Sequence, residues 1–209
     1  EANTNGSGMF AYLDNVSTLD LSGLDTSNMT SMSGMFYNSK SLTNIDLSGF
    51  DTSKVVTMAN MFEGCTNLKD LDVSNFKTSN VIYMAGMFEN CSNIENLDLS
   101  NFDTSKVTEM GTKSSSSGGM FHGCTNLKSL NLSNFDTSNV VLMGNMFSGC
   151  ASLESLNLSS FDTSNIEHMG YMFNACSSLK SLDLSNFNTS RVVDMTRMFT
   201  RCYELSELN

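Results

Sequence analysis

The chain has 209 residues, of which 40% are hydrophobic, and 22 acidic against 11 basic side chains give a formal net charge of −11. So few basic residues argue against nucleic-acid binding, which needs a basic surface, and disfavour docking on an anionic membrane. No stretch approaches the roughly 18 apolar residues of a membrane span, so we expect no membrane insertion within this segment.

The dipeptide Met-Phe recurs along the whole chain and defines a period. Its copies begin at Met9, Met35, Met61, Met87, Met120, Met146, Met172 and Met198. Successive copies are 26 residues apart, except for one interval of 33 that contains a seven-residue insertion at 112–118. Because such repeats bury their apolar sides only against neighbouring repeats, the period predicts a solenoid. We expect residues 1–209 to form a single solenoid of about eight units, taken from a longer protein.

The first part of each unit predicts a short β-strand. Apolar residues alternate within it, as in residues 68–74 and 179–185, which is typical of a strand with one face turned inward. Such strands are expected to pair in parallel about 4.8 Å apart. The right-handed crossover rule predicts the hand of the coil.

The second part of each unit, Asp-Thr-Ser-x-Val-x-x-Met-x-x-Met-Phe, predicts a short helix. Its apolar residues, for example Val140, Met143, Met146 and Phe147, lie at i, i+3, i+6 and i+7, which is one helical face. The Thr-Ser pair before it is placed to cap the helix. Gly or Asn dominates the position before the Cys column, which suits a left-handed residue ending a helix. This column reads Asn38, Gly64, Asn90, Gly123, Gly149, Ala175 and Arg201.

These elements predict an α/β solenoid of leucine-rich-repeat type. We expect a right-handed coil with a parallel β-sheet on its concave face and short helices on its convex face. The insertion at 112–118 is expected on the helical side, where it is either part of a functional face or a tolerated flexible tip.

The Met, Phe and Cys residues fall in fixed columns of the repeat, which indicates core packing rather than redox chemistry. The Cys column holds Cys65, Cys91, Cys124, Cys150, Cys176 and Cys202, and Leu13 and Ser39 occupy the same place in two other units. We therefore expect a row of buried free thiols. Disulfides between neighbouring units are the less favoured alternative, because parallel side chains lack the required geometry. A zinc site is less favoured still, because no Cys-x-x-Cys or nearby His completes it.

The sequence predicts no catalytic centre, metal or cofactor. Its two His residues, His122 and His168, are expected to be exposed, with His168 on the outer side of a helix. Neither stands in a pattern that pairs it with a nucleophile or a base. The chain also lacks a phosphate-binding Gly-rich loop and a nucleophile elbow. We expect a protein that is not an enzyme, with cleavage of polysaccharide as a distant alternative.

A polar column between the two strand leucines points away from the core and is the candidate ligand-binding site. It comprises Asp20, Asp46, Asp72, Asp98, Asn131, Asn157 and Asp183. Extended concave faces are where solenoids usually bind partners. Because carboxylates stacked about 4.8 Å apart repel one another, these Asp residues must hydrogen-bond to neighbouring Ser, take up protons or gather cations.

Three interpretations of this column remain open. It is a solvated face that discourages aggregation, a face that binds protein or glycan, or a weak Ca²⁺ site. Because substitution of Asp46, Asp72 and Asp98 by Ala removes like charges, we expect it to leave stability unchanged or slightly raised. A second acidic column, Asp25, Asp51, Asp103, Asp136 and Asp162, is interpreted as Asx-turns or caps.

The full unit, LxxLDLSxFDTSxVxxMxxMFxxC, resembles the 26-residue repeats of BspA-like bacterial leucine-rich-repeat surface proteins over residues 9–209. The Ser-rich insertion and the missing end caps depart from that pattern. The resemblance implies a secreted, wall-anchored or lipid-anchored protein of the bacterial cell surface, in some members an adhesin for host matrix proteins or other cells. It carries over no catalytic residue and names no ligand.

The leading hypothesis is a non-catalytic adhesion module that recognises protein or glycan on host or neighbouring cells through its concave face. A structural spacer that displays another domain on the bacterial surface is the alternative.

Overall fold

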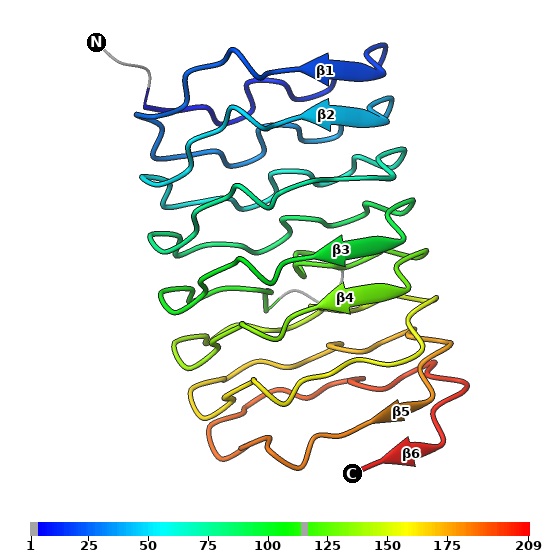
Figure 1. The fold of residues 1–209 in the computed structure, drawn as a ribbon. Coiled ribbons are helices and arrows are strands. Elements are labelled where there is room, and N and C mark those ends of the chain that lie inside the picture. Colours follow the sequence, from blue (N-terminus) through cyan, green and yellow to red (C-terminus); the bar gives the residue numbers. More distant parts are fainter. Residues whose placement is uncertain (1–3, 114–116) are drawn as a thin grey trace.

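The structure is a computed structural model that describes residues 4–113 and 117–209. The chain winds through stacked coils, and its two ends lie at opposite ends of an elongated body (Figure 1). Six short strands lie along one side of the stack. They are β1 (Thr18–Asp20), β2 (Asn44–Asp46), β3 (Asn96–Asp98), β4 (Ser129–Asn131), β5 (Ser181–Leu182) and β6 (Glu207–Leu208).

The strands pair in parallel, as the sequence predicts, but they do not form one continuous sheet. They form three two-stranded sheets, β1-β2, β3-β4 and β5-β6. The register follows the repeat, with Asp20 opposite Asp46 and Asp98 opposite Asn131. Between the sheets lie two strand-like segments, 70–72 and 155–157, that are not part of any sheet. The second is held to β5 by a single bridge from Ser155 to Ser181, whereas the first has no bridge among the described residues.

The predicted helices are wrong: the part of the chain that the structure describes contains none. The Met-Phe part of each unit is instead a run of turns in which peptide N–H groups alternate between two partners. The N–H of Gly34 donates to the carbonyl of Ala59 in the next coil at 2.8 Å, and the N–H of Met35 donates to Met32 three residues back at 3.2 Å.

Left-handed residues explain why no helix forms. The expected left-handed column before Cys is confirmed at every position, from Asn38 (φ 53°) to Arg201 (φ 65°). A second left-handed position precedes it by four residues, as at Gly34 (φ 59°) and Asn60 (φ 59°), in the middle of the predicted helix. The unit with the insertion is the exception, because its left-handed residue is Gly118 (φ 90°), five residues before Gly123. A residue with positive φ interrupts a right-handed helix and turns its peptide groups outward, so they bond to the next coil instead.

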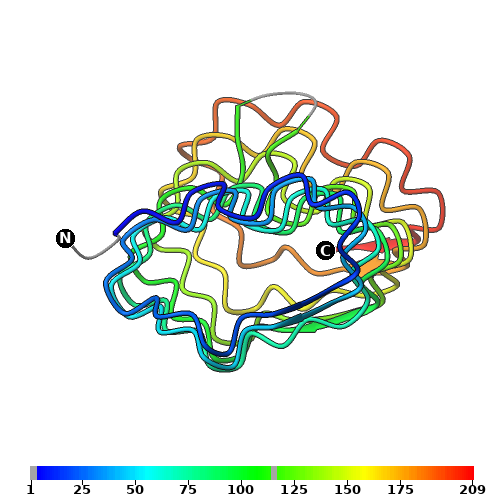
Figure 2. The same ribbon diagram turned by 90° about the horizontal axis from the view of Figure 1, so that it is seen from above.

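The turns carry a second ladder on the side opposite the named strands. Isolated parallel bridges link the coils through Asn5, Ser31, Thr57, Tyr83, Glu109, Leu142, His168 and Asp194. This ladder is unbroken from the first of these residues to the last, whereas the strand side is interrupted twice. Figure 2 looks along the stack and shows the coils enclosing a common interior, with the chain on either side of residues 114–116 leaving the coil away from the strands.

The Met, Phe, Leu and Val columns meet inside the coil and form one hydrophobic cluster, as expected. The Phe residues of the Met-Phe motif stack from Phe10 to Phe199, with neighbouring ring centroids 5.4–5.8 Å apart and planes within 13°. Rings at this separation gain favourable contact beyond simple burial. The stack fixes the spacing of the coils from within, while the two backbone ladders fix it from outside.

The Thr column has a different role from the predicted cap. Thr52 is buried, and its hydroxyl donates to the carbonyl of Lys77 in the next coil while accepting the N–H of the same residue. The same exchange joins Thr78 to Asp103. The preceding Asp column forms the expected Asx-turns, for example from the N–H of Ser53 to Asp51. Each Asp-Thr-Ser segment therefore turns the chain and bonds it to the next coil.

The Cys residues are free and five of the six are buried, as expected. Each thiol donates to a Phe carbonyl of the preceding coil, as from Cys65 to Phe36 at 3.2 Å. Ser39 takes the same role with Phe10 at 2.7 Å, which explains why Ser and Cys share the column. Burial raises the pKa of Cys65 to about 12, so these thiols stay protonated and unreactive.

Candidate functional site

The seven predicted site residues lie in a row on the strand side of the stack, where their side chains are exposed. We call them the Asx row: Asp20, Asp46, Asp72, Asp98, Asn131, Asn157 and Asp183. Four of them are the last residues of β1, β2, β3 and β4. Asp72 and Asn157 end the segments 70–72 and 155–157, and Asp183 directly follows β5, at the same place in the repeat.

Each member of the Asx row accepts a hydrogen bond from the backbone N–H two residues later. The distances are 2.9–3.2 Å, from Ser22 on Asp20 to Ser185 on Asp183. These Asx-turns end the strand and bend the chain toward the core. Of the three expected responses to charge repulsion, hydrogen bonding to the neighbouring Ser is the one that the structure shows.

The hydrogen bonds to the Asx row favour the ionised form of its carboxylates. Hydrogen bonds from the hydroxyl and the backbone N–H of Ser74 hold the pKa of Asp72 below its usual value, and the N–H of Ser100, followed by its hydroxyl, lowers that of Asp98. Asp98 also accepts a hydrogen bond at 3.2 Å from the amide of Asn131. The row is therefore both a turn element and a line of negative charge.

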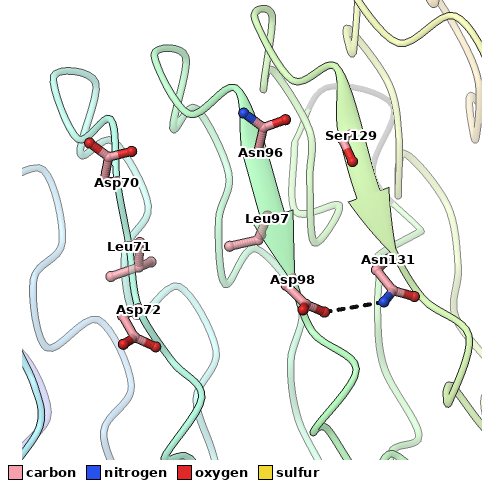
Figure 3. A pocket seen from close by; sticks show the side chains of 8 residues that line it. All are labelled: Asp70, Leu71, Asp72, Asn96, Leu97, Asp98, Ser129 and Asn131. Carbon is pink, nitrogen blue, oxygen red and sulfur yellow. Dashed lines mark hydrogen bonds between the residues drawn. The ribbon is translucent and has the colours of Figure 1, made fainter.

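A groove of about 540 Å³ opens on this face where strand pairing is interrupted (Figure 3). It lies between the unpaired segment 70–72 and the pair β3-β4. We call it the strand groove, and its lining comprises Asp70, Leu71, Asp72, Asn96, Leu97, Asp98, Ser129 and Asn131. The lining contains three carboxylates and no basic side chain. Leu71 is only partly buried, so the floor offers an apolar contact as well.

A row of alternating charge borders the strands, and sequence reasoning missed it. Its members are Lys69, Glu95, Lys128, Glu154 and Lys180. Nζ of Lys128 lies 2.8 Å from Oε2 of Glu95, and Nζ of Lys180 lies 2.6 Å from Oε2 of Glu154. Because all four side chains are more than half exposed, these pairs contribute little to stability. The alternation of Lys and Glu at one place in the repeat was the signal that could have revealed this row.

His122 is not the isolated exposed residue that the sequence suggests. Its Nδ1 lies 3.0 Å from Oε1 of Glu89, whose side chain is only 4% exposed. The other oxygen of Glu89 accepts the N–H of Gly118 at 2.8 Å. These contacts join residues 29 and 33 apart and hold the end of the insertion against the coil. The tip of the insertion, 114–116, lies outside the described residues, so the prediction of its role stays open.

His168 lies in the second ladder, between Leu142 and Asp194, rather than on a helix. Its Nδ1 is buried and has no hydrogen-bond partner within 4–113 and 117–209. Hydrogen bonds from Thr196 lower the pKa of Asp194, with a smaller contribution from His168.

Groups of His, Cys, Asp or Glu placed to hold a metal ion do not occur in the described residues. No helix in the same residues is suited to crossing a membrane.

Residues 4–118 and 115–208 match a protein family described as Mycoplasma protein of unknown function, DUF285. The chain belongs to this family. None of the curated proteins compared with it matches. A leucine-rich cell surface protein from Faecalibacterium prausnitzii A2-165 is similar in structure, with 14% sequence identity, a TM-score of 0.40, and coverage of 93% of this chain and 83% of that one.

Membership of this family assigns no activity, because the family's description states that its function is unknown. The finer resemblance to BspA-like proteins stays a prediction. The geometry of the strand side is therefore the main guide to function.

Proposed function

We propose that this chain is a non-catalytic binding module that recognises a partner, protein rather than glycan, through its strand side. The observation that carries the proposal is the strand groove, an open acidic groove on the face that carries the Asx row. The Asx-turns hold the carboxylates in place without neutralising them. Because these charged side chains are already held in place, they can attract and select a partner of opposite charge with little loss of conformational entropy on binding.

The proposed setting is the bacterial cell surface, where the module mediates adhesion. This part of the proposal rests on the resemblance of the repeat to BspA-like surface proteins. A net charge of −11 suits contact with basic regions of extracellular proteins, because complementary fields raise association rates. Nucleic acid, itself negatively charged, is not a proposed partner.

Binding by immobilised protein tests the proposal. The chain is coupled to beads and offered a panel of purified host matrix proteins and a glycan array. A matched variant carries Asn at Asp20, Asp46, Asp72, Asp98 and Asp183, because Asn131 and Asn157 form the same Asx-turn without charge.

We expect the native chain to capture at least one basic matrix protein and the variant to capture less of it. Equal capture by both proteins would show that the strand side does not bind. Failure of the native chain to capture any protein or glycan would favour the structural spacer.

A further inference from the structure

Four titratable side chains follow one another along the stack at the place directly after the Met-Phe motif. We call them the titratable column, which comprises Tyr37, Glu63, Glu89 and His122. Backbone hydrogen bonds between coils keep them in register, as from the N–H of Gly64 to the carbonyl of Glu89 at 2.8 Å. The other units hold side chains without charge at this place, namely Ala11, Ser148, Asn174 and Thr200.

Side-chain contacts run along the whole titratable column. The hydroxyl of Tyr37 donates to the carboxyl of Glu63, which in turn lies close enough to Glu89 for their charges to interact. Oε1 of Glu89 lies 3.0 Å from Nδ1 of His122, while its Oε2 accepts the N–H of Gly118 at 2.8 Å. The titratable column is therefore bonded to the backbone at the end of the insertion.

The two ends of the insertion are fixed in different ways. The hydroxyl of Thr112 donates to the carbonyl of Ser117 at 2.8 Å, which closes the base of the insertion on itself. At the N-terminal end, the N–H of Thr112 donates to the carbonyl of Gly144 at 3.2 Å. At the C-terminal end, the N–H of Gly118 donates to the carboxylate of Glu89. Only the second of these two attachments to the coil involves a group that titrates.

Glu89 is the buried member of the titratable column, with a side chain only 4% exposed. A buried carboxylate is stable only while protein groups replace the water that it has lost. Here these groups are the imidazole of His122 and the N–H of Gly118. No lysine or arginine forms an ion pair with Glu63 or Glu89 within residues 4–113 and 117–209. The stability of this carboxylate therefore depends on the charge of its neighbours in the column.

The remaining titratable groups near these carboxylates stay neutral. Burial raises the pKa of the nearby thiols of Cys91 and Cys124. The charge of Glu63 and burial raise the pKa of Tyr37. Changes in charge close to Glu89 are therefore confined to Glu63 and His122.

The charge of Glu63 changes near neutral pH. Burial, followed by the charge of Glu89, raises the pKa of Glu63 to about 7. Below that pH Glu63 is neutral, and Glu89 has no charged carboxylate beside it. Above that pH two neighbouring carboxylates repel each other where little water screens them. Because Tyr37 holds Glu63 from the other side, movement of Glu89 toward water relieves this repulsion and breaks its bond to Gly118.

We propose that the titratable column is a pH-sensitive fastening, which holds the C-terminal end of the insertion on the coil in mildly acid solution and loosens it as the solution becomes alkaline. Glu63 responds to the pH, and the bond that breaks joins Glu89 to Gly118. The N-terminal end stays attached, because its bond joins two peptide groups. This proposal goes beyond the proposed function and does not depend on it.

NMR spectroscopy of the complete 209-residue chain tests the proposal, because it reports on single backbone amides. The amide proton shift and the hydrogen-exchange protection of Gly118 are measured at about pH 5 and pH 8, on either side of the pKa of Glu63. Protection is expressed relative to an unstructured peptide at the same pH, which removes the intrinsic effect of pH on exchange. The amide of Thr112 is the internal control, because unfolding of a larger region would expose both amides.

Two variants complete the test. Glu63→Gln keeps the size of the side chain and stays neutral at every pH. Glu154→Gln removes the same charge from a side chain that is more than half exposed on the strand side. Circular dichroism at both pH values confirms that the two variants are folded.

We expect the protection of Gly118 in the native chain to fall about tenfold from pH 5 to pH 8, which corresponds to a coupling of about one pKa unit. The protection of Thr112 should change by less than about threefold. The amide proton of Gly118 should shift upfield with a midpoint near the pKa of Glu63, about 7. Both responses should disappear in Glu63→Gln and persist in Glu154→Gln.

Three results would overturn the proposal. The first is constant protection of Gly118 in the native chain, even where its amide proton shifts, because this would show titration without release. The second is an unchanged response in Glu63→Gln. The third is equal loss of protection at Gly118 and Thr112, because this would show that a larger region unfolds.

Discussion

The hydroxyl of Thr78 donates to the carbonyl of Asp103 at 2.9 Å and accepts the N–H of the same residue at 2.8 Å. One buried side chain thus satisfies both peptide groups of a residue in the next coil. Thr78→Val keeps the shape and removes the hydroxyl, so the N–H and C=O of Asp103 lose their partner on the buried side of the turn. We expect the free energy of unfolding to fall by about 1–3 kcal/mol, as measured by urea denaturation.

Thr78→Ser is the matched control for that variant, because it keeps the hydroxyl. A Val variant as stable as the Ser variant would show that the double hydrogen bond is unimportant.

Substitution in the Asx row should lower stability rather than preserve it. Asp72→Ala deletes the acceptor for the N–H of Ser74, so the turn after the strand-like segment loses its fixing bond. We expect a lower melting temperature for this variant and near-native melting for Asp72→Asn, measured by circular dichroism. This replaces the expectation, based on charge alone, that Ala is neutral or stabilising. Melting of the Ala variant at or above the native temperature would restore the charge-based expectation.

Stability should depend on pH through Glu63. Burial raises the pKa of this carboxyl to about 7, helped by the charge of Glu89 and opposed by His122 and a hydrogen bond from Tyr37. The folded chain therefore holds a proton that the unfolded chain, with a pKa near 4.5, releases earlier. Stability from this group is complete below about pH 4.5 and is lost as the pH rises to about 7.

The test is Glu63→Gln, which keeps a neutral group of the same size. We expect its melting temperature to exceed that of the native chain at pH 8 and to vary less between pH 5 and 7. Parallel pH curves for the two proteins would exclude Glu63 as the source.

Thiol reactivity should follow burial. Five Cys are buried and Cys202 is partly exposed, while burial raises the pKa of Cys124 to about 12 and that of Cys202 to a smaller degree. Because the thiolate is the reactive form, a chromogenic disulfide reagent should modify Cys202 first and the others only after unfolding. All six thiols should react in denaturant. A count below six in denaturant, restored by a reducing agent, would reveal disulfides.

The sequence was sufficient to predict the columns of the core and the left-handed residues before Cys, because both recur at fixed places in every unit. It did not suffice for the backbone of the Met-Phe part. The spacing of the apolar residues there fits a helix as well as it fits the observed run of turns. Only the second left-handed column, which includes Gly34 and Asn60, distinguishes the turns from a helix. Gly and Asn midway between two Met residues were the available signal.

The candidate site was predicted in position but not in shape. The outward direction of the Asx row follows from strand alternation alone. The groove at residues 70–72 depends on where the pairing between neighbouring coils is interrupted, and the contact of Glu89 with His122 and Gly118 depends on chain segments brought together by stacking. Interactions between coils are not visible in any one unit of the repeat.

The unbroken ladder through Ser31, Thr57 and Tyr83 repeats the same backbone contacts at every coil, whatever side chain each coil carries. A whole coil can therefore be added or removed without redesign of the coils on either side, because each contacts only its neighbours. Recombination between repeats would then lengthen or shorten the protein in steps of one coil while leaving every remaining coil intact. We therefore expect the length of the solenoid to vary among related strains with little effect on its folding.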